Sequence, residues 1–206
     1  MKGAIFDLDG VIVDTAKYHY LAWKELADEL GFFFKESDNE RLKGVSRMRS
    51  LEILLEVGGI TASESEKLEM AESKNARYVK MLDNLDKSEL LEGTENYLKK
   101  LRSERVLISL GSASKNAPLI LEKLGIADLF DAIVDGNSVS KAKPDPEVFL
   151  KAAQMLNLSP AECCVFEDSQ AGIEAARRAG CSVIAVDKGN VLKDADEYVK
   201  CLGDLL

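Results

Sequence analysis

Short apolar segments alternate with stretches of helical periodicity, and this alternation constrains the fold more than any other feature of the sequence. The five apolar segments are residues 4–6, 106–110, 130–134, 163–166 and 182–186. Runs of this kind are typical of strands that are buried on both faces. Helices between such strands indicate βαβ units. The sequence therefore predicts an α/β protein built on one parallel sheet.

A long helical section follows the first predicted strand. Residues 15–82 contain no convincing strand, and Trp23, Leu26 and Leu30 share one face of a predicted helix. Ser63 and Glu66 have the spacing of a capping box at the start of another helix. We therefore expect residues 15–82 to form an inserted helical cap domain, with residues 1–14 and 83–206 as the core domain.

The composition excludes several classes of protein. The formal net charge is −9, whereas a nucleic-acid or anionic-membrane surface needs a basic patch. No run of 18 apolar residues is present, so we expect no membrane span. The four cysteines lack C-x-x-C spacing and are expected to be reduced. We expect a monomeric, cytoplasmic protein that acts on a small molecule.

Polar residues follow four of the predicted strands. The carboxyl ends of parallel strands meet at one edge of a sheet, where ligands bind, so these residues should converge. Taken alone, Asp7 and Asp9 would favour a strand-ending turn, because Asp and Gly both favour turns. The residues are Asp7 and Asp9, then Ser112, then Lys143 after a loop, then Glu167 and Asp168.

This set of side chains points to phosphoryl transfer. Oxygen ligands without His or Cys suit a hard cation, and Mg²⁺ is the one that pairs a few carboxylates with a phosphate. Carboxylates also act as nucleophiles and form aspartyl phosphates. No G-x-S-x-G elbow, phosphate-binding P-loop or G-x-G-x-x-G motif is present, which disfavours serine hydrolases, P-loop enzymes and dinucleotide enzymes.

Four segments in this order resemble the motifs of the haloacid dehalogenase superfamily: Asp7-Leu-Asp9-Gly-Val11, Ser112, Lys143-Pro144 and Glu167-Asp168. The resemblance implies a Rossmann-like core with a helical cap. It also implies that Asp7 is the nucleophile and that Asp9 is the general acid/base, with its backbone carbonyl on Mg²⁺. Glu167 and Asp168 would complete the metal site, and Ser112 and Lys143 would hold the transferring phosphate.

Further segments resemble the β-phosphoglucomutase family within that superfamily. That family interconverts β-glucose 1-phosphate and glucose 6-phosphate through a bisphosphate. The resemblance implies that Arg47, Ser114, Lys115 and Asn116 hold the second phosphate, and that His19 and Lys74 contribute from the cap. Gly44, Val45, Ser46 and Ala113 would complete the substrate site. The matching segments are residues 42–51, His19 with Trp23, Lys74-Asn75, residues 112–116 and residues 167–172.

Alternatives remain for several of these residues and for the function. His19 could be a packing residue, because it shares a helix face with Trp23. Lys74 could lie on an exposed charged face, and Glu167 could support the metal site without binding the metal. A Mg²⁺-dependent sugar-phosphate phosphatase would use the same core motifs, and a non-catalytic binder of sugar phosphates is the third hypothesis.

Overall fold

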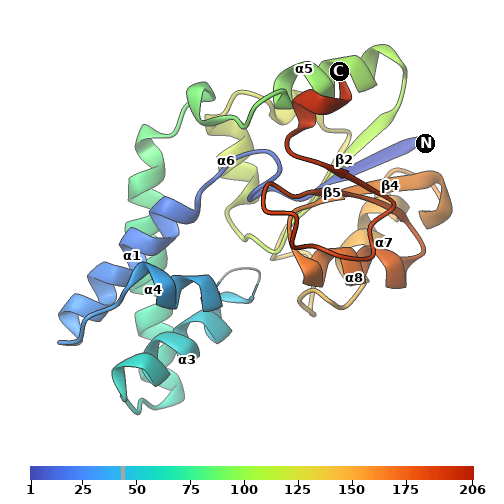
Figure 1. The fold of residues 1–206 in the computed structure, drawn as a ribbon. Coiled ribbons are helices and arrows are strands. Elements are labelled where there is room, and N and C mark those ends of the chain that lie inside the picture. Colours follow the sequence, from blue (N-terminus) through green and yellow to red (C-terminus); the bar gives the residue numbers. More distant parts are fainter. Residues whose placement is uncertain (43–44) are drawn as a thin grey trace. The chain divides into compact units, whose positions relative to one another are not determined.

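The computed structural model describes residues 1–42 and 45–206, which form two compact units. The sheet unit consists of Met1–Asp14 and Leu85–Leu206, and the helical unit consists of Thr15–Asn84. Figure 1 shows the chain entering the helical unit after its first strand. That the sheet unit is the catalytic core and the helical unit is the cap stays a prediction from the sequence.

The sheet unit contains a parallel sheet whose six strands, among the described residues, run in the order β3-β2-β1-β4-β5-β6. The predicted α/β class with a Rossmann-like parallel sheet is confirmed. The strands are β1 (Gly3–Phe6), β2 (Leu107–Gly111), β3 (Ala132–Val134), β4 (Cys163–Glu167), β5 (Ser182–Val186) and β6 (Glu197–Val199).

Helices cover both faces of this sheet (Figure 1). Helices α7 (Glu147–Met155) and α8 (Gln170–Ala179) pack on one face, whose core includes Ile5, Phe149 and Val165. Helix α5 (Thr94–Ser103) packs on the other, where Phe6 and Phe166 stack with ring centroids 4.4 Å apart. The remaining helical elements are α6 (Ala117–Lys123), η3 (Lys87–Glu89), η4 (Ala127–Leu129), η5 (Pro160–Glu162) and η6 (Leu202–Leu205).

Each of the five predicted strands is present, but sequence patterning missed the sixth. Strands β1 and β4 are buried along their whole length, which explains their continuous apolar character. In β6, Glu197 and Tyr198 are exposed, and the strand pairs only with β5 at the edge of the sheet. A three-residue edge strand with polar side chains carries no hydrophobic pattern, so it could not be recognised.

The two connections to the helical unit leave the sheet unit at one place. Val13 and Leu90 form an antiparallel bridge, and the Leu91 N–H donates to the Ile12 carbonyl at 3.0 Å. The buried Thr94 hydroxyl also donates to Ile12, at 3.4 Å. The segments before and after the insertion are therefore held side by side.

The helical unit is built on α1 (Ala16–Glu29), α3 (Arg47–Gly58) and α4 (Glu64–Met81). The predicted capping box at α4 is present, since the Glu66 N–H donates to Ser63 Oγ and the Ser63 N–H donates to the Glu66 carboxylate. Trp23, Leu26 and Leu54 lie in its apolar core. Shorter elements are α2 (Glu36–Asn39), η1 (Glu40–Leu42) and η2 (Leu82–Asn84).

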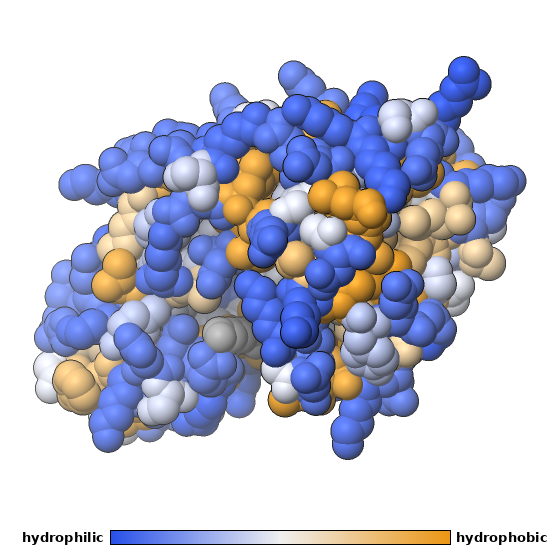
Figure 2. Space-filling view, turned by 45° about the horizontal axis from the view of Figure 1, so that its top comes forward, coloured by the Kyte–Doolittle hydropathy of each residue, from blue (hydrophilic) through white to orange (hydrophobic). Residues whose placement is uncertain are grey.

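The surface is in keeping with the composition. Hydrophilic residues cover most of the face drawn in Figure 2, and the apolar patches on it are smaller. In the described part of the chain, no helix combines the length and apolar character that crossing a membrane requires.

Candidate active site

The carboxyl ends of three neighbouring strands bring the sequence-predicted residues of the sheet unit together. Asp7 follows β1, Ser112 follows β2 and Glu167 ends β4, and these strands are adjacent in the sheet. The Asp7 N–H donates to the Phe166 carbonyl at 3.0 Å, which continues the β1–β4 pairing as far as Asp7. The order of the strands alone therefore places these three groups at the carboxyl end of the sheet.

Lys143 is the centre of this cluster. Its Nζ donates to Asp7 Oδ1 at 2.6 Å and to Glu167 Oε1 at 2.5 Å, and its side chain is only 6% exposed. The ammonium also lies 4.8 Å from the centroid of the Phe149 ring. Burial opposes the charge of Lys143, but the two carboxylates outweigh this and raise its pKa. Lys143 is therefore a buried, permanently charged group beside Asp7.

The carboxylates of the cluster are crowded. Burial raises the pKa of Asp7 to about 7, Lys143 opposes this rise, and Glu167 and Asp9 add to it. The pKa of Asp168 is also raised, first by the protein atoms around the carboxyl and then by Glu167 and Asp7, although Asp168 still reaches solvent. Carboxylates that repel one another are suited to a cation.

Gly10 allows Asp168 to approach the loop after β1. Gly10 has a φ of +81°, and a Cβ at this position would collide with Asp168 Oδ2. The side chain of Asp168 therefore lies against the backbone that connects Asp9 to Val11. Glycine is required here both for the backbone conformation and for the space.

Both carboxylate oxygens of Glu167 accept hydrogen bonds from protein groups. Oε1 accepts from Lys143, and Oε2 accepts from the Ser169 N–H and from its hydroxyl, both at 2.8 Å. Ser169 also caps α8, because its Oγ accepts from the Gly172 N–H at 3.1 Å. These contacts favour the alternative in which Glu167 positions Lys143 and is not a ligand. Ser169 was missed as a supporting residue, although a serine just before a helix is a recognisable cap.

The donor set fits a hard cation through two carboxylates and a backbone carbonyl. Among residues 1–42 and 45–206, no three Asp, Glu, His or Cys side chains form a metal-binding group. Mg²⁺ needs fewer, since it takes one or two carboxylates and fills its other positions with water and phosphate oxygens. Asp7 and Asp168 would supply the carboxylates, and the Asp9 carbonyl, a ligand that the family resemblance implies, would supply the third oxygen.

The segment from Ser112 to Asn116 forms a turn ahead of α6. The buried Ser112 Oγ accepts from the Ser114 N–H at 3.1 Å, and Ser114 Oγ accepts from the Asn116 N–H at 3.3 Å. The Lys115 carbonyl accepts from the Asn137 side chain at 3.2 Å, and Ala113 lies between the two serines. These bonds fix the loop that follows β2.

His19 and Lys74 meet inside the helical unit. Lys74 Nζ lies 2.8 Å from His19 Nδ1, and Lys74 is only 3% exposed. The ammonium lies 4.4 Å from the Trp23 ring centroid and 4.9 Å from that of Tyr78. The exposed-surface alternative for Lys74 is therefore wrong.

Arg47 lies close enough to affect this pair. The pKa of His19 is lowered well below its usual value by burial and then by Lys74 and Arg47. Arg47 is half-buried at the first position of α3, and this burial lowers the pKa of its guanidinium. Ser46 caps that helix, accepting from the Arg49 N–H at 3.3 Å, and Val45 packs on the apolar core. Gly44 lies outside the described residues.

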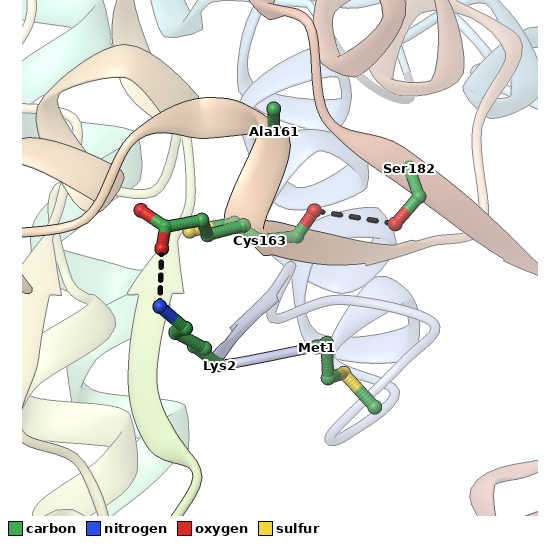
Figure 3. A pocket seen from close by; sticks show the side chains of 6 residues that line it. Met1, Lys2, Ala161, Cys163 and Ser182 are labelled. Atoms are coloured by element: carbon green, nitrogen blue, oxygen red, sulfur yellow. Dashed lines mark hydrogen bonds and ion pairs between the residues drawn. The ribbon is translucent and has the colours of Figure 1, made fainter.

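A hollow at the opposite edge of the sheet carries no such chemistry (Figure 3). It has a volume of about 290 Å³ and lies at the amino ends of β1, β4 and β5. Lys2 is paired with Glu162 at 2.7 Å, and the Ser182 hydroxyl donates to the Cys163 carbonyl at 3.2 Å. Burial raises the pKa of the Cys163 thiol to about 11, which leaves it unreactive.

Comparison with known proteins agrees with the motifs of the sheet unit. Residues 1–180 match the family described as haloacid dehalogenase-like hydrolase. The chain belongs to this family. Membership confirms the resemblance of the four motifs, and a divalent metal is the cofactor that it implies.

Members of the haloacid dehalogenase-like family with assigned activities are similar over nearly the full chain. A β-phosphoglucomutase of Bacillus subtilis is 46% identical, covering 100% of this chain and 92% of the relative. A crystal structure of β-phosphoglucomutase from Clostridium difficile is 43% identical with a TM-score of 0.94, covering 100% of this chain and 93% of that one. A phosphorylated carbohydrates phosphatase of Thermotoga maritima is 33% identical, covering 87% of this chain and 82% of the relative.

Proposed function

We propose that the chain is a β-phosphoglucomutase, which interconverts β-D-glucose 1-phosphate and glucose 6-phosphate through glucose 1,6-bisphosphate. The observation that carries phosphoryl transfer is the Asp7 carboxylate 2.6 Å from the buried Lys143 ammonium. The 46% identity to a β-phosphoglucomutase over the whole chain supports a mutase within this chemistry.

Asp7 acts as the nucleophile. Lys143 engages Oδ1, and we assign the attack on phosphorus to Oδ2. The new bond joins Oδ2 to phosphorus, the bond from phosphorus to the sugar oxygen breaks, and an aspartyl phosphate forms. Lys143 and the Ser112 hydroxyl bind oxygens of the transferring phosphoryl group, whose charge they offset without moving far.

Asp9 moves the proton. In the first half-reaction it removes a proton from the sugar hydroxyl that attacks the aspartyl phosphate, which gives the bisphosphate, and in the second it protonates the sugar oxygen that leaves when Asp7 takes up the other phosphoryl group. Its position two residues after Asp7 puts both carboxyls on the loop after β1. The sugar turns between the two steps, so both of its ends must fit the site in either orientation.

Mg²⁺ is the cation that this site fits best. Asp7, Asp168 and the Asp9 backbone carbonyl would hold it, and Glu167 would hold Lys143 in place. When bound, the ion offsets the repulsion between the carboxylates and the incoming phosphate. Mg²⁺ typically binds oxygen ligands, whereas zinc favours His and Cys.

Cations of the helical unit serve the second phosphate and the sugar. Arg47 can hold a phosphate with two parallel hydrogen bonds, and Lys74 adds a second cation beside neutral His19. Such local cations are needed because the chain carries a net charge of −9, which repels an anionic substrate. In this proposal Thr15–Asn84 is the cap domain and the sheet unit is the catalytic core.

Other predicted substrate contacts complete the proposal. The turn that contains Ala113, Ser114, Lys115 and Asn116 contributes to the second phosphate site, and Gly44, Val45 and Ser46 line the cap side. We also propose a cytoplasmic location. It is supported by free cysteines among the described residues, of which Cys163, Cys164 and Cys181 are buried.

Product analysis tests this function directly. Purified protein is incubated with β-glucose 1-phosphate, Mg²⁺ and a trace of glucose 1,6-bisphosphate, and glucose 6-phosphate and free phosphate are measured in the same tube. We expect glucose 6-phosphate without matching phosphate release. Free phosphate alone would instead indicate a sugar-phosphate phosphatase, the kind of activity named for the T. maritima relative that is 33% identical.

An Asp7→Asn variant is the control for the nucleophile. An amide cannot attack phosphorus as a carboxylate does, so labelled bisphosphate should leave no label on this variant. Label on Asp7→Asn at the wild-type level would refute the role of Asp7.

A further inference from the structure

We propose that Tyr78 is a positioning residue, which holds His19 and Lys74 in one arrangement and thereby presents His19 Nε2–H as a fixed hydrogen-bond donor. The inference rests on the proposed function for its consequence in catalysis. Its structural part concerns the helical unit alone and can be tested without turnover.

The tautomer of His19 follows from its partner. Lys74 Nζ lies 2.8 Å from Nδ1, and an ammonium has donors but no acceptor. Nδ1 must therefore accept, and in a neutral imidazole the proton is then on Nε2. The two cations near the ring, Lys74 from α4 and Arg47 from α3, oppose a second proton on it. His19 is thus a neutral group with one donor of defined position.

Tyr78 contacts both members of this pair. Its ring stacks on the imidazole with centroids 4.0 Å apart and planes 19° apart, which sets the plane of the His19 ring. The Lys74 ammonium lies 4.9 Å from the centroid of the same ring. Tyr78 is four residues after Lys74 on α4, the spacing that brings two side chains together on a helix.

The Tyr78 ring is itself held in place. It is fully buried, and its hydroxyl donates to Thr15 Oγ1 at 3.1 Å, where Thr15 is also fully buried at the start of α1. Tyr78 therefore connects α4 to the first residue of the helical unit and to His19, one turn along α1. The bond to Thr15 restricts movement of the ring at its hydroxyl, and full burial restricts its rotation, so the plane of the stacked imidazole is restricted as well.

The consequence for the reaction is a fixed donor. A neutral Nε2–H suits an oxygen of a sugar or phosphate, whereas an imidazole that rotates or changes tautomer would present an acceptor part of the time. Loss of the ring should raise KM and lower kcat/KM about tenfold, the factor that corresponds to about 1.4 kcal/mol, within the range for one hydrogen bond.

Nitrogen NMR gives a readout that a merely structural role would not change. His19 is the only histidine, so ¹⁵N-labelled protein gives one imidazole spectrum. For the wild type we expect a neutral ring between pH 6 and 8, with Nε2 protonated and Nδ1 unprotonated. Tyr78→Met keeps an apolar side chain that fills the space but lacks the ring and the hydroxyl. We expect averaged nitrogen shifts for it, from a mixture of tautomers.

Two further variants complete the design. Tyr78→Phe keeps the stacked ring and removes only the bond to Thr15, so it should retain the tautomer and lose about threefold in kcat/KM. Tyr20→Phe is the matched control, because Tyr20 lies on the same helix as His19 but its hydroxyl donates to the Phe34 carbonyl, at 3.4 Å. It should change neither the nitrogen spectrum nor the kinetics.

The outcomes separate this inference from the proposed function. A folded Tyr78→Met protein with the wild-type nitrogen spectrum would overturn the positioning role. If that variant does not fold, a Tyr78→Phe protein with unchanged kinetics would overturn it instead. A wild type with the expected tautomer but without mutase activity would refute the proposed function and leave the positioning of His19 supported.

Discussion

The buried ammonium of Lys143 should contribute far more to stability than an exposed one in a similar ion pair. Lys143→Met removes the charge but keeps most of the apolar stem. The matched control is Lys151→Met, because Lys151 pairs with Glu147 at 2.6 Å while its side chain is 41% exposed. Lys143 makes contacts of 2.6 and 2.5 Å with a side chain that is 6% exposed, so the two variants differ mainly in burial.

The magnitude follows from the distances. At an effective dielectric constant of about 20, unit charges 2.6 Å apart attract by about 6 kcal/mol, and desolvation of each ion offsets several kcal/mol of this. Removing one partner of a buried pair leaves the other charge uncompensated, which costs about 3–5 kcal/mol. We expect that loss in the free energy of unfolding for Lys143→Met and about 0–1 kcal/mol for Lys151→Met.

Urea unfolding, followed by far-UV circular dichroism at pH 5 and pH 8, measures both losses. Without Lys143, the pKa of Asp7 should rise further above its unfolded value of about 3.9. The folded variant then gains stability as the pH falls and Asp7 takes up a proton, so its deficit should be smaller at pH 5. Equal losses for the two variants, or a Lys143→Met deficit that does not depend on pH, would refute this reasoning.

Three further predictions concern Gly10, Asp7 and Arg47. Gly10→Ala should weaken Mg²⁺ binding by about 10–100-fold in calorimetry, because the added Cβ displaces Asp168. Gly180→Ala is the control: Gly180 also has a positive φ, but a Cβ there meets no neighbour, so this variant should bind Mg²⁺ normally. Without metal, the melting temperature should fall as the pH rises from 5 to 8. The pKa of Asp7 is raised to about 7 in the folded protein, so the stability that the neutral carboxyl contributes is lost as Asp7 ionises. Added Mg²⁺ should reduce this fall. Arg47→Ala should slow mutase turnover more than the labelling of Asp7 by bisphosphate, and equal losses in both assays would remove Arg47 from the second phosphate site.

The sequence predicts the sheet well because burial leaves a direct pattern in it. Strands such as β1 and β4 are apolar at successive positions, and the residues directly after them must lie at one edge. Asp7, Ser112 and Glu167 could therefore be placed together from the order of strands and polar residues alone. Strand β6 could not be placed in this way, because Glu197 and Tyr198 face solvent at an edge.

The detailed contacts of the site depend on loops and therefore escaped prediction. Both oxygens of Glu167 are engaged by Lys143 and Ser169, and nothing in the spacing of these residues reveals this. By its sequence alone, Tyr78 is only one more aromatic residue in a stretch of helical periodicity. Its spacing of four residues from Lys74 was the available indication that it also supports a cation.

The bridge between Val13 and Leu90 has a consequence for the way such enzymes diversify. Because the two connections leave the sheet unit side by side, the inserted segment behaves as a loop whose ends are already joined, and loops of this kind tolerate replacement. In the proposed function the insert binds the substrate, so exchanging it between paralogues would alter which phosphate ester is selected while the strands of the sheet stay intact. Selectivity and chemistry can thus evolve as separate modules of one gene.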